Sequence, residues 1–191
     1  MLARSPGSLV GSAPDRTTGA HIVAAYIALL RAINVGGTVL PMPALVEMCR
    51  SAGFKGARTY IASGNALFTS RLGAHQVKSA LESRLADCLG KPIDVHVRTA
   101  AELAAVLAAN PFPEAPPSRT VAVFLEEPPP AGALEAVRGR KREALALGTR
   151  EIYVVYPDGI AASKLVIPAA RTGTARNMNT VAKLAALAAA L

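Results

Sequence analysis

Two glycines that follow an apolar segment near the beginning of the chain could bring the backbone close to an anion. The segment carries Arg31, Asn34, Gly36 and Gly37, and Pro41 then opens a stretch with helical periodicity. A glycine loop between a strand and a helix start gathers unpaired peptide N–H groups and the positive end of a helix dipole. An arginine there adds bidentate hydrogen bonds to a phosphate or carboxylate. Because the Gly-Lys-Ser/Thr ending of a P-loop is missing, two interpretations stay open: an anion site, or a turn that only needs positive φ.

Two more polar clusters lie further along the chain. Ser63-Gly64-Asn65 predicts a tight turn, in which Ser and Asn side chains also bond their own backbone. Arg176-Asn177-Met178-Asn179 precedes the last predicted helix, where either asparagine suits an N-cap. Arg176 and Lys164 are suited to bind an anion or to pair with carbonyl groups at a helix end. The anion-site interpretation takes these residues together: Arg31, Asn34, Gly36, Gly37, Ser63, Gly64, Asn65, Lys164, Arg176, Asn177 and Asn179.

Residues for most other chemistries are isolated. The three histidines, His21, His75 and His96, are far apart and have no metal-ligand spacing. No pair of carboxylates suits two-metal or glycosidase chemistry. Cys49 and Cys88 are expected on the apolar sides of helices and form neither a disulfide framework nor a zinc spacing. The sequence therefore predicts no metal, no cofactor and a reducing, cytoplasmic setting.

The charge balance favours an anionic partner. Of 191 residues, 21 are Lys or Arg and 13 are Asp or Glu, a net charge of +8, and no acidic residue follows Gly159. Such a surplus attracts phosphate groups. A small molecule is favoured over nucleic acid, because the basic run Arg138–Arg142 is typical of a solvated loop and aromatics for stacking on RNA are few. The apolar run Ile22–Leu30 is too short to span a bilayer, which needs roughly 20 residues, so no membrane partner is expected, and the sequence indicates no oligomeric state.

The elements that must position these residues follow from periodicity. An apolar run, two amphipathic helices and three further strands give the order β-α-β-β-α-β, the split βαβ or ferredoxin-like arrangement. The predicted ranges are Ile22–Leu30, Pro41–Gly53, Ala57–Ala62, Asn65–Thr69, Ala74–Leu89 and Ile93–Arg98. The first and third strands are antiparallel neighbours in this arrangement, so Asn65 is expected beside Arg31.

The second part of the chain looks like a degenerate version of the first. Thr99 and Glu102 form a capping box for a helix that continues to Asn110, and prolines follow. The predicted later elements are a strand at Thr120–Leu125, a short helix at Ala131–Arg138, strands at Glu143–Leu147 and Glu151–Tyr156, a short helix at Ser163–Ala169, and a helix at Asn179–Ala190. We therefore expect an α+β protein with a disordered extension (1–21), a ferredoxin-like subdomain (22–98), a helix and Pro-rich linker (99–118) and a second ferredoxin-like subdomain (119–191), with antiparallel sheets covered by helices.

Several segments resemble a known family. Tyr26–Gly37, Thr59–Asn65, Asn110-Pro111-Phe112, Ser163-Lys164-Leu165 and Thr174–Thr180 with Lys183-Leu184 resemble, in this order, the bacterial family called domain of unknown function 1697. The resemblance covers nearly everything after residue 21 and implies two ferredoxin-like subdomains and no established activity. Two positions depart from the family pattern: Thr38 stands where Lys is usual, and Met178 where Trp is usual.

Three functions remain open on this basis. The first is a binding module for a phosphate-bearing small molecule or nucleic acid, at a basic cleft between the subdomains. The second is a metal-independent enzyme that acts on a small anionic substrate. The third is a structural or interaction protein, in which the polar motifs only hold the two halves together.

Overall fold

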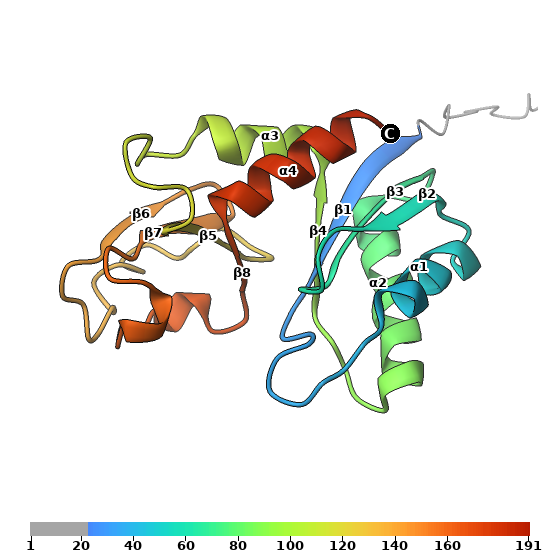
Figure 1. Cartoon of the computed structure of the whole chain (residues 1–191), viewed down its shortest axis with the longest axis horizontal. Coiled ribbons are helices and arrows are strands. Elements are labelled where there is room, and N and C mark those ends of the chain that lie inside the picture. Colours follow the sequence, from blue (N-terminus) through green and yellow to red (C-terminus); the bar gives the residue numbers. More distant parts are fainter. Residues whose placement is uncertain (1–22) are drawn as a thin grey trace, which may run out of the picture.

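The structure, a computed structural model, describes residues 23–191, and the extension expected at residues 1–21 lies outside them. The described residues form two four-stranded antiparallel sheets, sheet A and sheet B, and four α-helices. The predicted α+β class is therefore confirmed. Figure 1 shows the two sheets side by side.

Sheet A contains the first four strands of the chain. Its elements are β1 (Ala24–Leu30), α1 (Met42–Ser51), β2 (Lys55–Thr59), β3 (Asn65–Ser70), α2 (Ala74–Leu89) and β4 (Val95–Thr99). The strand order is β2-β3-β1-β4, and β1 runs antiparallel to both of its neighbours. Leu29 lies opposite Asn65, so the end of β1 and the start of β3 lie at the same edge of the sheet.

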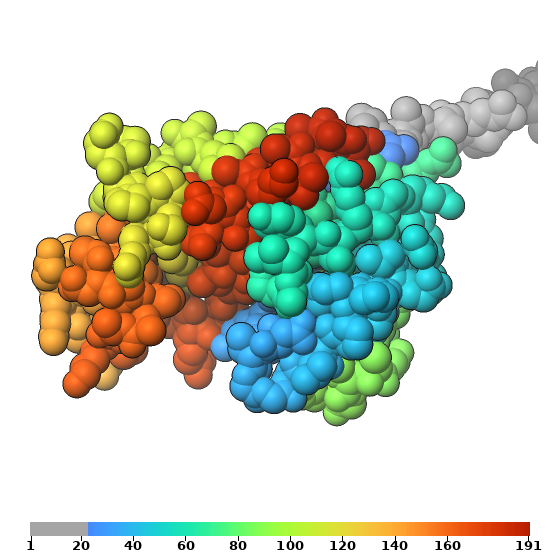
Figure 2. All heavy atoms as spheres, in the orientation of Figure 1, coloured from blue at the N-terminus to red at the C-terminus, as the bar shows by residue number. Residues whose placement is uncertain are grey.

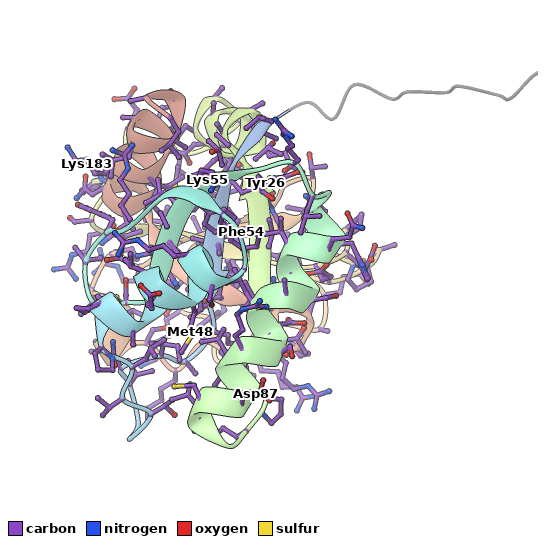
Figure 3. The ribbon with its side chains drawn as sticks, turned by 90° about the vertical axis from the view of Figure 1, so that its right-hand side faces the viewer. Tyr26, Met48, Phe54, Lys55, Asp87 and Lys183 are labelled. Atoms are coloured by element: carbon purple, nitrogen blue, oxygen red, sulfur yellow. The ribbon has the colours of Figure 1, made fainter. Side chains whose placement is uncertain are left out.

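Helices α1 and α2 cover the outer face of sheet A (Figure 3). Side chains of a strand alternate between its two faces, and Tyr26, Ala28 and Leu30 of β1 point to these helices. Phe54, which follows α1, stacks on Phe68 of β3 with ring centroids 4.3 Å apart. This packing holds sheet A against its two helices, and the loop that follows β1 begins at the edge of the sheet after Leu30.

Sheet B repeats the strand order of sheet A with different connections. Its strands are β5 (Thr120–Phe124), β6 (Ala144–Leu147), β7 (Glu151–Val155) and β8 (Thr174–Asn177), in the order β6-β7-β5-β8. Strands β1 and β5 are therefore equivalent, as are β3 and β7, and β4 and β8. Each last strand leads directly into a helix: β4 into α3 (Ala100–Ala108) and β8 into α4 (Met178–Ala189).

Two short helices predicted in the second part of the chain are wrong. The range Ala131–Arg138 is a series of turns, in which Gly132 has a φ of +75°, a value that favours glycine and does not continue a right-handed helix. The range Ser163–Ala169 is mostly extended, between two three-residue 3₁₀ helices, η1 (Ile160–Ala162) and η2 (Pro168–Ala170). Turns and 3₁₀ helices therefore cover the outer face of sheet B, where sheet A has two longer α-helices.

Helices α3 and α4 pack against the inner faces of both sheets. One buried cluster combines Ile27 and Leu29 of β1, Phe124 of β5, Leu103 of α3 and Leu184 of α4. The two helices run close together on one side of the molecule (Figure 1). A single hydrophobic core thus joins the two halves of the chain.

The two cysteines differ in environment. Cys49 is buried, and burial raises the pKa of its thiol to about 12. Cys88 is exposed, so its expected place on an apolar helix face is wrong. Cys88 lies in the last turn of α2, one position outside the stripe that Leu81 and Leu85 place against sheet A.

No helix within residues 23–191 combines the length and the apolar character that a membrane span requires.

Candidate functional site

An open recess of about 350 Å³ lies where the end of β1 meets the start of β8. Both halves of the chain line it, with two arginines and no acidic residue. The lining residues are Leu30, Arg31, Ala32, Ile33, Val35, Ser63, Gly173, Thr174, Ala175 and Arg176. In Figure 2 the loop after β1, in blue, lies against the red segment that leads into β8. We call this place the arginine recess.

Arg176 holds the two halves together at the wall of the recess. Its side chain comes from β8 and crosses to the other sheet, where Nε donates to Oδ1 of Asn65 at 2.6 Å. Nη2 donates to the carbonyls of Leu30 at 3.0 Å and Ser63 at 2.9 Å. Nη1 donates to Thr174 and to the Ala175 carbonyl, both in its own strand.

All five N–H groups of Arg176 are therefore used within the protein. The side chain is 8 % exposed and forms no ion pair with a carboxylate among the described residues. Burial lowers the pKa of its guanidinium to about 10. A positive charge whose partners are all neutral carbonyl, amide and hydroxyl oxygens raises the potential of the recess without offering a free donor.

Arg98 makes the reverse connection: Arg176 reaches from sheet B to sheet A, and Arg98 reaches from sheet A to sheet B. It occupies in β4 the place that Arg176 occupies in β8, one residue before the N-cap of the following helix. Its Nη2 donates to the carbonyls of Leu125 and Arg150, which belong to the other half. Leu125 and Arg150 are equivalent to Leu30 and Gly64. The N–H of Leu125 donates to the Arg150 carbonyl, as the N–H of Leu30 donates to the Gly64 carbonyl. The two halves are thus fastened by reciprocal arginines, each 8 % exposed or less.

The loop after β1 has an alternating backbone. Ala32, Asn34 and Gly36 have φ values of +53°, +57° and +60°, whereas Ile33 and Val35 have no positive φ. Left-handed conformations are costly for residues other than glycine, and they cluster at binding sites. Residues that alternate in this way turn successive N–H groups to one side and make an anion-binding concavity called a nest.

Some peptide N–H groups of this loop form no hydrogen bond with the described part of the chain. Those of Ala32, Ile33 and Val35 donate no hydrogen bond within residues 23–191, whereas that of Asn34 donates to Thr38. The Asn34 side chain closes the loop, because it bonds both backbone groups of Leu40 and the Ala62 carbonyl. This closure fixes the strained backbone next to the turn that precedes β3.

Arg31 is the accessible cation of the recess. Its Nη2 donates to the Arg171 carbonyl at 2.9 Å, and its Nη1 lies 3.6 Å from a carboxylate oxygen of Asp94. The side chain is 40 % exposed, so a pair of this kind contributes little stability. The remaining side-chain N–H groups of Arg31 donate no hydrogen bond within the described residues 23–191.

The structure brings together five of the sequence-predicted site residues. Arg31, Ser63 and Arg176 line the recess, Asn65 binds Arg176, and Gly64 contributes a carbonyl 3.4 Å from Nη2 of Arg176. The side chain of Asn65 also donates to Ser63 and to the Tyr60 carbonyl, which shapes the turn.

Three predicted residues stand near the recess without lining it. Asn34 has the closing role described above, and Gly36 and Gly37 form the exposed tip of the loop, with no other atom near the place of a Cβ. The first turn of α1 does not line the recess either. The backbone of the loop, and not the start of the helix, therefore lines the recess.

The other predicted residues lie elsewhere. Asn177 is the N-cap of α4, accepting from the Thr180 N–H, and faces away from the recess. Asn179 is exposed in the first turn of that helix. Lys164 is exposed in the extended segment between η1 and η2 and makes no side-chain hydrogen bond or ion pair within residues 23–191.

The Ser163-Lys164-Leu165 triplet has a structural role through its serine. The Ser163 hydroxyl donates to the Glu143 carboxylate and accepts from the Leu165 N–H. The hydrogen bond from Ser163, with one from the Lys141 N–H, lowers the pKa of Glu143 to about 2. The triplet therefore anchors the segment before β6.

The two departures from the family pattern are accommodated locally. Thr38 is 9 % exposed and accepts a hydrogen bond from the ammonium of Lys91. A lysine charge therefore lies beside position 38, although it comes from Lys91 and not from residue 38 itself. Met178 is 4 % exposed and packs in the core shared by the two sheets.

Sequence reasoning missed Arg98 and His96. Both alternate with Val95 and Val97 on β4, and the alternation predicted a half-exposed strand. The polar face of β4 is instead buried against sheet B, where His96 is 3 % exposed and lies 3.1 Å from the Thr172 carbonyl. The equivalence of Arg98 with Arg176, each directly before a helix cap, was the signal in the sequence.

No group of three or more His, Cys, Asp and Glu side chains within residues 23–191 is arranged to hold a metal ion.

Comparisons with known proteins agree with this description. Residues 23–153 match the model of the family described as "Protein of unknown function (DUF1697)". The solved structure of the conserved bacterial protein SP0830 from Streptococcus pneumoniae is similar, with a TM-score of 0.72 and 24 % sequence identity, over 87 % of this chain and 99 % of that one. No curated protein sequence matches. Since the family model covers well over half of the residues, the chain belongs to the DUF1697 family.

Proposed function

We propose that the protein binds a phosphate-bearing small molecule in the arginine recess. The observation that carries this proposal is the alternating backbone of residues 32–36, with peptide N–H groups of Ala32, Ile33 and Val35 unbonded in the described part of the chain. A nest of this kind suits a phosphate oxygen. Arg31 supplies the charge-assisted contacts, and the buried charge of Arg176 supports them at the wall of the recess.

The recess lies between the two parts of the chain that we treat as subdomains, residues 22–98 and 119–191, connected by residues 99–118. Ligand binding would then draw on both parts, because Arg31 comes from one and Gly173 and Thr174 from the other. A bound anion would add to the fastening that Arg176 provides.

Calorimetric titration with inorganic pyrophosphate and with AMP tests the proposal. Pyrophosphate presents phosphate alone, and AMP adds a nucleoside. We expect binding that weakens between about 50 and 200 mM salt, since the interaction is partly between exposed charges. Arg31→Gln should weaken it about tenfold or more, the size of one lost charge-assisted contact.

Lys164→Gln is the matched control, because it removes one positive charge outside the recess. It should leave the affinity within about twofold of the unchanged protein. Equal losses in Arg31→Gln and Lys164→Gln would mean that diffuse charge, and not the recess, attracts phosphate. Binding of a single-stranded oligonucleotide in preference to both probes would assign the surface to nucleic acid.

One observation favours a second candidate, a purely structural role. All five donors of Arg176 are used within the protein, as a scaffold role requires. In that case neither probe binds to the unchanged protein or to Arg31→Gln.

A further inference from the structure

A larger hollow lies on the outer face of sheet B, away from the arginine recess. It has a volume of about 550 Å³ and lies between β5, β8 and η1. On the equivalent face of sheet A, α1 and α2 are 10 and 16 residues long, whereas η1 and η2 have three residues each. The shorter cover leaves part of the sheet face unpacked. In Figure 2 the yellow segment before β5, the orange segment after β7 and the red start of α4 meet on this side.

The walls of the hollow are mainly apolar. Val121, Ile160, Ala161, Ala162 and Ala175 line it. Its volume lies within the range of small-molecule sites, roughly 300–1,000 Å³, which are also mostly apolar with a few polar groups. Ile160 is 60 % exposed, so one wall of the hollow presents a large apolar side chain to solvent.

Two polar groups at the hollow lack a partner within residues 23–191. Tyr156 is 8 % exposed, and its hydroxyl makes no hydrogen bond there. Burial, with the nearby Glu143 carboxylate, raises the pKa of this hydroxyl, so it remains a neutral donor. The Arg119 guanidinium lies over Gly159, where a Cβ would stand 2.3 Å from Nη1, and it makes no hydrogen bond or ion pair among the described residues.

The remaining polar side chains of the hollow form no ion pair with Arg119, which is an exposed residue. Asp158 lines the hollow, but its carboxylate pairs with Arg142 at 3.0 Å. Asn177 also lines the hollow; its side-chain oxygen caps α4, and its amide N–H₂ donates no hydrogen bond within residues 23–191. The unbonded groups are thus a cation and neutral donors, which suit an acceptor that carries a negative charge.

We propose that this hollow is a second ligand site, which takes a small apolar molecule with one carboxylate. The apolar body packs against Val121, Ile160 and Ala175, the carboxylate binds Arg119, and the Tyr156 hydroxyl donates to an acceptor oxygen. This site shares no charged residue with the arginine recess, so it stands or falls independently of the proposed function.

Titration with 3-phenylpropionate, followed by ¹H–¹⁵N NMR shifts, tests the site. The neutral 3-phenylpropanamide has nearly the same shape and is the matched probe. We expect saturable binding of the acid with a Kd on the order of a few millimolar, as is typical for a ligand of about eleven heavy atoms. The shifts should concentrate at residues 119–121, 156–162 and 175–177, and the amide should bind about tenfold more weakly.

Three variants separate the contributions. Arg119→Gln should weaken the acid about tenfold and leave the amide unchanged. Ala161→Leu fills the hollow without removing a polar group and should abolish binding of both probes. Arg31→Gln alters the other recess and should change nothing in this titration.

Several outcomes would overturn the site: no saturation by the acid, equal affinity for acid and amide, or undiminished binding to Ala161→Leu. An effect of Arg31→Gln as large as that of Arg119→Gln would also overturn it, because it would move the carboxylate to the arginine recess. Circular dichroism and an unchanged spectrum away from the hollow show that each variant is folded.

Discussion

Replacing Arg176 by Met should cost the protein about 3 kcal/mol of unfolding free energy. Met keeps the length and apolar body of the side chain but has no donors. The change removes three hydrogen bonds from β8 to the other half, those to Leu30, Ser63 and Asn65. Their acceptors are buried or half-buried, so water does not fully replace the lost donors.

The magnitude is a difference between two effects. Hydrogen bonds from a charged group contribute about 1.5–3 kcal/mol each, so three contribute on the order of 6 kcal/mol. Burial of the guanidinium opposes them, and the fall of its pKa from 12.5 to about 10 corresponds to about 3 kcal/mol. The net loss of about 3 kcal/mol should lower the urea midpoint by roughly 1.5 M, for an m-value near 2 kcal/mol/M.

Urea unfolding followed by circular dichroism measures the effect. Arg84→Met is the matched control: Arg84 also donates three hydrogen bonds, to the Ala80 carbonyl and to the hydroxyl and carbonyl of Ser51, but those to Ser51 are exposed to solvent, and their loss should cost about 1 kcal/mol or less. Arg176→Lys keeps the charge but has three donors that diverge from one nitrogen, so it should recover at most half of the loss. A midpoint for Arg176→Met within about 0.3 M of the unchanged protein, or full recovery with Lys, would refute this account.

Further predictions concern the turn before β3, the thiols and acid stability. Gly64→Ala should destabilise the protein more than Gly37→Ala by about 1–3 kcal/mol in urea unfolding: both glycines have positive φ, but only at position 64 would a Cβ lie 3.0 Å from another side chain. Equal losses would show that the crowding is relieved. Ellman's reagent should titrate Cys88 in the folded protein and Cys49 only after unfolding; two fast thiols would contradict the burial of Cys49. Glu143 has a folded pKa of about 2, below its unfolded value of about 4.3, so its stabilisation is complete above the unfolded pKa and is lost as pH falls through 2. The stability difference between the unchanged protein and Glu143→Gln should therefore shrink from pH 6 to pH 2, and a constant difference would contradict this assignment.

The sequence predicted the parts of the fold that depend on local periodicity. Residues 24–99 contain the expected β-α-β-β-α-β order, and the capping box at Thr99 and Glu102 is present. The short helices expected near residues 131–138 and 163–169 are not, because apolar spacing over so few residues also fits a turn or an extended segment that packs on a sheet. In both ranges the contacts with sheet B decide the conformation.

The candidate site was predictable where it depends on residues near strand ends. Antiparallel pairing placed Asn65 at the edge where β1 ends, so its closeness to the loop after Leu30 could be expected. The contact of Arg176 with Asn65 spans 111 positions and depends on how sheet B meets sheet A, which no local pattern reports. Arg98 was missed for the same reason: it stands directly before a helix cap as Arg176 does, but this likeness becomes informative only once the contact between the two sheets is known.

The position of α4 has a consequence for synthesis of the protein. This helix covers the inner face of sheet A, whose last strand ends at Thr99, but α4 begins only at Met178. At about 5–20 residues per second a ribosome needs roughly 4–16 s to add the intervening residues. During that interval α3 is the only helix made, among those of residues 23–191, that packs on Ile27, Leu29 and Leu67, so part of this apolar patch stays uncovered until α4 is complete.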